Sequence, residues 1–284
     1  MIVSGTKELM KHCPSVNWKV EGTRLNDFID RAQQWVVERI LGTDIEDLLE
    51  EDIAEGQSDP HEKLRKLASR AICEKSYLDA IAEMDLQLSE AGFVVQSNDA
   101  VSPASQQRTE QLRKSLDKRL TDDCDSLVKY LLFNSRPDNA YENWRGTQQF
   151  MYLTASFTPT CISVLNKIPL TIQLNWDDFY NSIPKMEHAL HTTVAKYCSI
   201  EQIEKLLELY RDDELLREHY YVFYKMSESA AIEVFEDKIN ASVRAVEARN
   251  YMLKHLELFP DFAESDKREL PGINFDAGGI VNTL

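Results

Sequence analysis

The sequence predicts a mainly α-helical protein, a helical bundle with one β-hairpin near residues 86–97. Three observations support this fold class. Glycine and proline number only nine each in 284 residues, and both are excluded from the interiors of long helices. Apolar residues recur at helical spacing over several long segments, and Ser, Thr or Pro stands where many of those segments begin. The hydrophobic fraction of 43% is close to the globular norm, so the chain can build a core.

The first two long helical signals follow each other closely. After a short helix predicted over 5–13, residues 24–41 form an amphipathic segment that ends at Gly42. A second helix then begins at Thr43, and Glu46 stands three residues later, which is the spacing of a capping box. The apolar stripe of 24–41 comprises Leu25, Phe28, Ile29, Ala32, Trp35, Val36, Arg39 and Ile40.

Two longer helices flank the predicted hairpin. The helix over 60–84 begins with proline in its first turn, and a later helix begins at Pro103 and runs to about Phe133. Between them the apolar period changes from that of a helix to that of a strand, around Ser-Glu-Ala-Gly. The hairpin over 86–97 needs a partner surface, because two strands alone are only marginally stable.

The second half of the chain contains the same kinds of helix and turn signal. Residues 134–156 are rich in turn signals, and helices are predicted near 158–167, 176–197, 201–210 and 213–257. Ser199 and Gln202 form a second capping box, and Asp213 is placed to cap the following helix. The residues from Phe259 onward have no apolar period and are predicted to form an extended tail.

The order of signals in the two halves suggests an internal duplication. In each half a short helix ends at a proline, a tryptophan precedes an Asp-Phe pair, and an amphipathic helix leads into a capping box. The alternative is that similar helical hairpins share cap chemistry without common ancestry. The predicted domains are 1–135 with the hairpin, 150–258 as a second helical domain, and 259–284 as a C-terminal tail.

Charge and cysteine usage limit the partners and the compartment. The net charge of −16 opposes binding to phosphate backbones, so we expect no sequence-specific nucleic acid as a partner. We also expect no membrane partner, because the chain has no signal-peptide pattern and no apolar run long enough to span a bilayer. The five widely spaced cysteines indicate buried free thiols in a reducing, cytoplasmic setting. They are Cys13, Cys73, Cys124, Cys161 and Cys198.

The search for reaction chemistry predicts no catalytic, cofactor-binding or metal-binding residue, and therefore no enzyme. The sequence contains no phosphate-binding loop, dinucleotide-binding glycine motif or nucleophile elbow. His188 and His191 lie one helical turn apart and could share a metal, but we favour the alternative that they are surface histidines on a polar face.

Interface residues are the only site prediction. In the hairpin they are the apolar strand residues Leu86, Leu88, Phe93 and Val95, which need a partner surface. In the second half they are the tyrosines of a dense aromatic run, Tyr220, Tyr221 and Tyr224. Core packing is the alternative explanation for that aromatic run.

The segment from Asp85 to Ser105 resembles a family of uncharacterised proteins from phages and prophages of Bacteroides-type gut bacteria. The shared pattern is Gly-Phe-Val-Val at 92–95 with Asn98, then Pro-Ala-Ser at 103–105 and a helix carrying Arg108. The helical layout over 25–49 also resembles phage head–tail connector (adaptor) proteins. This second resemblance implies a helical subunit that forms a ring and contacts the portal and other virion proteins.

Three functions follow as hypotheses. The first is a phage-derived assembly protein, a head–tail connector or neck component that forms a homo-oligomer and resides in the virion. The second is a bacterial helical scaffold that binds proteins in an apolar groove. The third is an enzyme whose site is assembled only in space, for example around His188 and His191.

Overall fold

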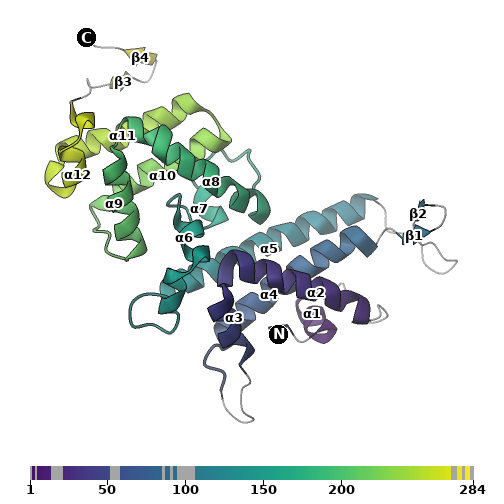
Figure 1. Ribbon diagram of the computed structural model, residues 1–284. Helices are drawn as coiled ribbons and strands as arrows, with labels where there is room; N and C mark the ends of the chain where they lie inside the picture. Colours follow the sequence, from purple (N-terminus) through teal and green to yellow (C-terminus); the bar gives the residue numbers. More distant parts are fainter. Residues whose placement is uncertain are drawn as a thin grey trace. The chain divides into compact units, whose positions relative to one another are not determined.

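The computed structural model divides the chain into two compact units, Met1–Gln149 and Phe150–Leu284 (Figure 1). Residues 136–149, which the sequence placed between two domains, are part of the first unit. The structure describes residues 2–3, 5–13, 22–51, 58–84, 87–89, 92–94, 106–269, 274–276 and 279–281.

The first unit is built mainly from helices. They are α1 (Thr6–His12), α2 (Gly22–Val36), the π-helix η1 (Val37–Leu41), α3 (Thr43–Glu50), α4 (Glu62–Met84), α5 (Gln106–Asn134), the 3-10 helix η2 (Glu142–Gly146) and the start of α6 (Gln148–Thr154). The long helices α4 and α5 lie side by side, and α2 packs against α4 (Figure 1).

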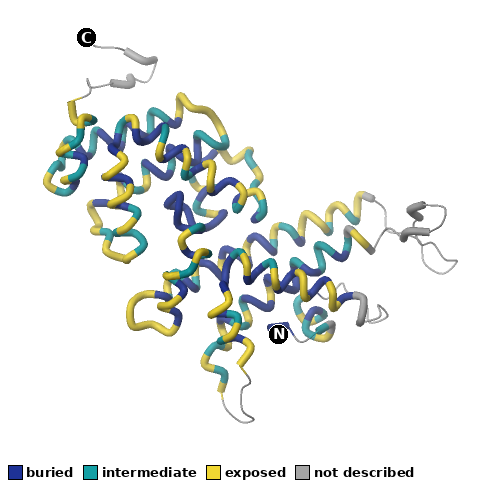
Figure 2. The backbone as a smooth tube through the Cα atoms, viewed as in Figure 1, coloured by how far each residue is buried: buried dark blue, intermediate teal, exposed yellow. Residues whose placement is uncertain are grey.

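The core of this unit follows the predicted apolar stripes. Six of the eight stripe residues between Leu25 and Ile40 are buried, and only Trp35 and Arg39 stay half-exposed. Figure 2 shows buried and exposed positions alternating along α4 and α5, as expected when each helix turns one face to its neighbour. The buried face of α5 comprises Leu116, Leu120, Cys124, Leu127, Val128 and Leu131.

The predicted capping box at Thr43 is wrong. Thr43 lies inside α3, and Gly42 precedes the helix with a φ of 77°, which glycine adopts without strain. The side chain of Glu46 accepts a hydrogen bond from Gln33 Nε2 at 2.9 Å instead of returning to the helix start. Gln33, which lies 13 positions earlier in the chain, therefore donates to the carboxylate that the local pattern assigned to the capping box.

The predicted β-hairpin is present over the described residues 87–89 and 92–94. Strand β1 (Gln87–Ser89) pairs antiparallel with β2 (Gly92–Val94), and Leu88 is the register partner of Phe93. The two strands form a sheet of their own. Leu86 and Val95 lie outside the described residues, as do the side chains of both strands.

The second unit contains the end of α6 and a larger set of helices. They are α7 (Cys161–Leu165), α8 (Trp176–Thr192), η3 (Val194–Lys196), α9 (Ile200–Arg211), α10 (His219–Phe235), α11 (Lys238–Lys254), η4 (Leu256–Leu258), α12 (Pro260–Ala263) and η5 (Asp266–Arg268). A second hairpin joins β3 (Asn274–Asp276) to β4 (Gly279–Val281). Helix α10 packs against both α8 and α11.

Local caps decide where several of these helices begin. Ser199 Oγ accepts a hydrogen bond from the Gln202 backbone at 3.2 Å, as the second capping box predicts. Asp213 does not cap α10; it adopts a φ of 61° in a turn, and α10 begins six residues later at His219. Asp237 separates α10 from α11, because its Oδ1 accepts from the backbones of Ile239 and Asn240.

The prediction of an extended tail from Phe259 is wrong for residues 259–269. Phe259 and Phe262 are fully buried, and a short helix forms between them. The Phe262 backbone donates to Gln202 Oε1 at 3.2 Å, and Arg249 Nε donates to the carbonyl of Lys267 at 2.9 Å. Two aromatic anchors and two tertiary hydrogen bonds thus hold a segment that has no helical period of its own.

The fold class predicted from the sequence is confirmed: the chain is a mainly α-helical bundle. All five cysteines are buried free thiols, as their spacing indicated. Among the described residues, no helix has both the length and the apolar content needed to cross a bilayer. The duplication of the two halves stays a prediction.

Candidate functional site

The predicted tyrosine interface lies on one exposed face of α10. Tyr220, Tyr221 and Tyr224 are 53%, 44% and 41% exposed, whereas Val222 and Met226 on the opposite face are fully buried. These exposed fractions are high for large aromatic side chains, which usually bury most of their surface. Core packing therefore accounts for only part of the aromatic run, and the three tyrosines form what we call the tyrosine face.

The tyrosine face is held in place by its neighbours. The Tyr221 ring lies 4.8 Å from the ring of Tyr251 on α11, measured between centroids. Lys167 Nζ lies 5.1 Å from the centroid of Tyr224, a distance at which a cation attracts the ring face. Burial lowers the pKa of Lys167 to about 8, so this amine is only weakly protonated above that pH. The face is therefore an ordered surface rather than a set of freely rotating rings.

The two neighbouring histidines lie on the surface of α8. His188 and His191 lie on α8 and both are exposed. Among the described residues, no group of three or more His, Cys, Asp or Glu side chains comes close enough to hold a metal ion. The arrangement is that of surface histidines.

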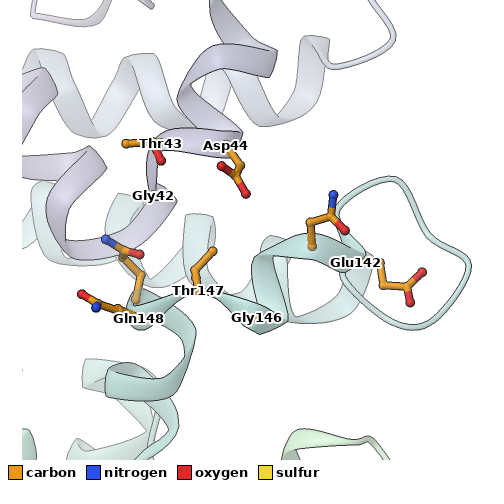
Figure 3. A pocket seen from close by; sticks show the side chains of 9 residues that line it. Gly42, Thr43, Asp44, Glu142, Gly146, Thr147 and Gln148 are labelled. Atoms are coloured by element: carbon orange, nitrogen blue, oxygen red, sulfur yellow. The ribbon is translucent and has the colours of Figure 1, made fainter.

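A cavity of about 800 Å³ lies where the start of α3 faces η2 and the start of α6 (Figure 3). Figure 3 shows Thr43 and Asp44 on one wall and Thr147 and Gln148 on the other. The lining is mainly polar, and it carries Asp44 and Glu142 but no Lys or Arg. Such a surface disfavours anions, and it lacks the apolar walls of a typical small-molecule site.

The π-helix η1 ends at Leu41, next to Gly42, which lines this cavity. A π-helix pairs residues five apart and leaves carbonyl groups needing other donors. Trp144 Nε1 donates to the carbonyl of Ile40 at 2.7 Å, and Gln149 Nε2 donates to the carbonyl of Glu38 at 3.1 Å. Because Trp144 is fully buried, these bonds fasten the 142–149 segment to η1 and give the π-helix a structural explanation.

A second site, which the sequence did not reveal, lies where α1 meets α4 and α5. Its centre is Glu74 on α4, which is only 4% exposed. Glu74 Oε2 lies 3.3 Å from Arg119 Nη2 on α5, and Arg70 Nη2 lies 3.3 Å from Asp123 Oδ1. We call these four residues and His12 the polar cluster. A cavity of about 290 Å³ opens beside it, lined by Lys11, His12, Arg70, Glu74, Arg119, Asp122 and Asp123.

Burial dominates the electrostatics of the polar cluster. It raises the pKa of Glu74 to about 7; Arg119 acts in the opposite direction without overcoming it, and Asp123 adds to the increase. Burial likewise raises the pKa of Asp123 and lowers that of His12. All three shifts favour the uncharged form, which is the expected effect of removing water from a charged group.

One signal in the sequence could have revealed this cluster. Asp123 stands between Leu120 and Leu127, at a position where the apolar stripe of α5 predicts a buried side chain. A charged residue at a stripe position requires a buried partner. The identity of that partner depends on how α4 and α5 align, and the sequence does not specify this.

The second unit has its own charged network between α10 and α11. Lys225 Nζ lies 2.9 Å from Glu228 Oε2 and 2.8 Å from Glu247 Oε2. Arg244 contacts the same two carboxylates, with distances of 3.5 Å to Glu228 and 2.9 Å to Glu247. We call these four residues the α10–α11 network. It adjoins the tyrosine face, since Lys225 Nζ is about 6 Å from two of its rings.

Comparison with known proteins identifies one similarity. Residues 25–152, a little under half of the chain, match a family of unknown function (DUF6712). The match runs from α2 into α6, so it includes α4, α5 and the cavity of Figure 3 but not α1, α7 or any later element. No curated protein and no solved structure is significantly similar to the chain.

Proposed function

We propose that the chain is a phage-derived structural protein, a head–tail connector or neck component that acts through contacts between identical subunits. Its partners are copies of itself and other virion proteins such as the portal, and its location is the host cytoplasm before assembly and the virion afterwards. The observation that carries this proposal is the tyrosine face of α10. The resemblance of the hairpin segment and of the helical layout over 25–49 supplies the viral context.

The tyrosine face has the composition of a contact surface between proteins. Tyrosine is enriched in the cores of such interfaces because its ring supplies apolar area and its hydroxyl tolerates water. Three tyrosines on one helical face, two of them adjacent in sequence, offer a larger aromatic area than scattered surface residues do. Since Tyr221 and Tyr224 are already held by Tyr251 and Lys167, little side-chain entropy is lost when the face is covered.

The two hairpins offer a second kind of contact. Within the described part of the chain each forms a two-stranded sheet. Such a sheet is marginally stable alone and can accept a strand from another chain at an outer edge. In this proposal the hairpins add contacts between strands of neighbouring subunits to the contacts made by the tyrosine face.

The net charge of −16 makes a specific prediction about salt. Copies of an acidic chain repel one another, and added salt screens that repulsion. Because the proposed contact is aromatic rather than ionic, assembly should strengthen as salt rises. An interface built from ion pairs would weaken under the same change.

The test is light scattering coupled to size exclusion at several protein and salt concentrations. We expect the full chain to form a discrete multimer that is favoured by salt. The combined substitution Tyr220→Ser, Tyr221→Ser and Tyr224→Ser should shift the protein to a monomer near 32.7 kDa while its helical circular dichroism stays unchanged. Imaging of the multimer should then reveal cyclic symmetry.

The matched control is the pair Phe133→Ser and Met151→Ser, two exposed apolar side chains outside the tyrosine face. This control should assemble like the unmodified chain. A chain that stays monomeric at all concentrations, and that also fails to bind the portal protein encoded in the same genome, would rule out the connector role. A multimer that survives loss of the three tyrosines would exclude this face as the contact.

A further inference from the structure

The short helix α1 covers the polar cluster in the first unit. It spans seven residues and has no side-chain cap at its start, so its own stability in water is low. It is held by burial of Leu9 and Cys13, which are fully inaccessible, and Cys13 Sγ donates a long hydrogen bond of 3.7 Å to the carbonyl of Cys73. Its docking therefore depends on the surface beneath it.

That surface contains a carboxyl group with incomplete hydrogen bonding. Glu74 Oε2 and Arg119 Nε are both buried, and neither has a hydrogen-bond partner within the described part of the chain. The charged and titratable groups around Glu74 come from all three helices or their ends: Cys13 next to α1, Arg70 on α4, and Arg119 with Asp123 on α5. An ionised carboxylate in this position is costly, because one ion pair at 3.3 Å and a hydrogen bond with the Cys13 thiol do not replace full hydration.

We propose that α1 is a proton-controlled strap, which stays docked while Glu74 carries a proton and detaches when Glu74 ionises. Detachment of α1 readmits water to the carboxylate, so the ionised form favours the open state. The strap covers a surface of α4 and α5 that lies inside the segment shared with the family of unknown function, whereas α1 lies outside that segment. The inference is independent of the connector role.

The direction of the pH effect follows from the two states. Glu74 has a pKa of about 7 when α1 is docked and is expected to return to its ordinary value of 4.5 when hydrated. Docking is therefore strongest at low pH and is lost as pH rises through 7. The raised pKa of Asp123 likewise makes docking stronger at low pH. His12 opposes it, since burial lowers its pKa and its protonation at acidic pH weakens docking. Docking should be tightest at mildly acidic pH.

The test is hydrogen exchange of the full chain at pH 5, 6 and 8, corrected for intrinsic exchange rates. Backbone amides of residues 6–13 should exchange about tenfold faster at pH 8 than at pH 6, the factor that follows from the two pKa values of Glu74. Amides in the middle of α4 should change much less. In Glu74→Gln the pH dependence between 6 and 8 should disappear, and in His12→Asn protection should keep rising down to pH 5.

The matched control is Glu62→Gln, which removes an exposed carboxylate from the same helix. It should exchange like the unmodified chain at every pH. Equal corrected exchange of residues 6–13 at pH 6 and 8 in the unmodified chain overturns the proposal, whether or not the variants fold. Persistence of the pH effect in Glu74→Gln overturns the assignment to Glu74.

Discussion

The helix pairs α4–α5 and α10–α11 place similar charged residues together with different consequences. In the first unit the contacts are two separate pairs, Glu74 with Arg119 and Asp123 with Arg70, each at 3.3 Å. In the second unit Lys225 lies within 2.9 Å of two carboxylates, and Arg244 contacts the same two. One pair of helices has isolated ion pairs, and the other has a connected network.

The pKa directions show what the difference means. Burial raises the pKa of Glu74, and its one ion-pair partner, Arg119, does not compensate even with the weaker effects of Cys13 and Arg70. Burial also acts to lower the pKa of Lys225, but the contacts with Glu247 and Glu228 outweigh it, and the pKa is raised. A buried group therefore stays ionised when two counter-charges contact it. It is close to being neutral when only one counter-charge contacts it. The comparison predicts that the first unit responds to physiological pH changes and the second does not.

The largest expected effect is on the pH dependence of stability. The folded-state pKa of Glu74 is raised from 4.5 to about 7, so its contribution is present below pH 4.5 and is lost as pH rises through 7. At 1.36 kcal/mol per pKa unit, the free energy of unfolding of the first unit should fall by roughly 3 kcal/mol between pH 4.5 and 8. Urea denaturation followed by hydrogen exchange on peptides of each unit measures this loss.

Glu74→Gln provides the control for that prediction. The variant should be more stable than the unmodified chain at pH 8 and similar at pH 5, because the amide stays neutral throughout. The second unit should change by less than about 1 kcal/mol over the same range. Equal slopes in both units would contradict the comparison, since they would trace the pH effect to the chain as a whole.

The second effect concerns the connected network. In Lys225→Met, Glu228 and Glu247 keep Arg244 as an ion-pair partner, Lys167 remains as a further positive charge near Glu228, and Glu228 is largely buried. We expect the second unit to lose about 2 kcal/mol at pH 8, which is below the usual cost of breaking a fully buried pair. Chemical denaturation at pH 8 measures it.

Lys238→Met is the matched control for Lys225→Met. Lys238 is 82% exposed, and its Nζ lies 3.7 Å from Glu233 Oε1, so solvent screens much of this ion pair even though the Glu233 side chain is largely buried. Its loss should change the unfolding free energy by less than about 0.5 kcal/mol. Similar losses in the two variants would mean that the network adds nothing beyond ordinary surface pairing.

The comparison also separates what the sequence predicts from what it cannot. Apolar periodicity located α2, α4, α5 and α9 to within a few residues, because each helix buries one continuous stripe. Caps were predictable only where no tertiary partner competed: Ser199 caps α9, whereas Gln33 captures Glu46 near Thr43. The buried segment around Phe259 was missed because two aromatic anchors hold it without any repeating pattern.

The tyrosine face, the polar cluster and the α10–α11 network also differ in how far the sequence predicts them. The tyrosine face could be predicted, because a dense aromatic run on one helix exceeds what a single buried stripe can absorb. The polar cluster could not, because Glu74 and Arg119 are 45 positions apart and meet only through the alignment of α4 with α5. The α10–α11 network likewise joins residues on two helices whose register no local pattern reports. Residue types predict that buried charges need partners, but not which partners they find.

The smallest expected effect is that of replacing one arginine with lysine, which compares the α10–α11 network with a single ion pair. Arg244 reaches both Glu228 and Glu247 through separate guanidinium nitrogens, a geometry that a lysine ammonium cannot reproduce. Because its side chain is 35% exposed, solvent screens part of this contact, and Arg244→Lys should cost only about 0.5 kcal/mol in the unfolding free energy of the second unit.

The counterpart of Arg244→Lys is Arg70→Lys in the first unit. Among the described residues Arg70 forms one ion pair, with Asp123, and it is 46% exposed, so the change should cost less than Arg244→Lys. Denaturation of both variants under identical conditions gives the difference directly. An equal cost at the two positions would mean that the second carboxylate adds no stability, and the contrast between network and pair would then rest on burial alone.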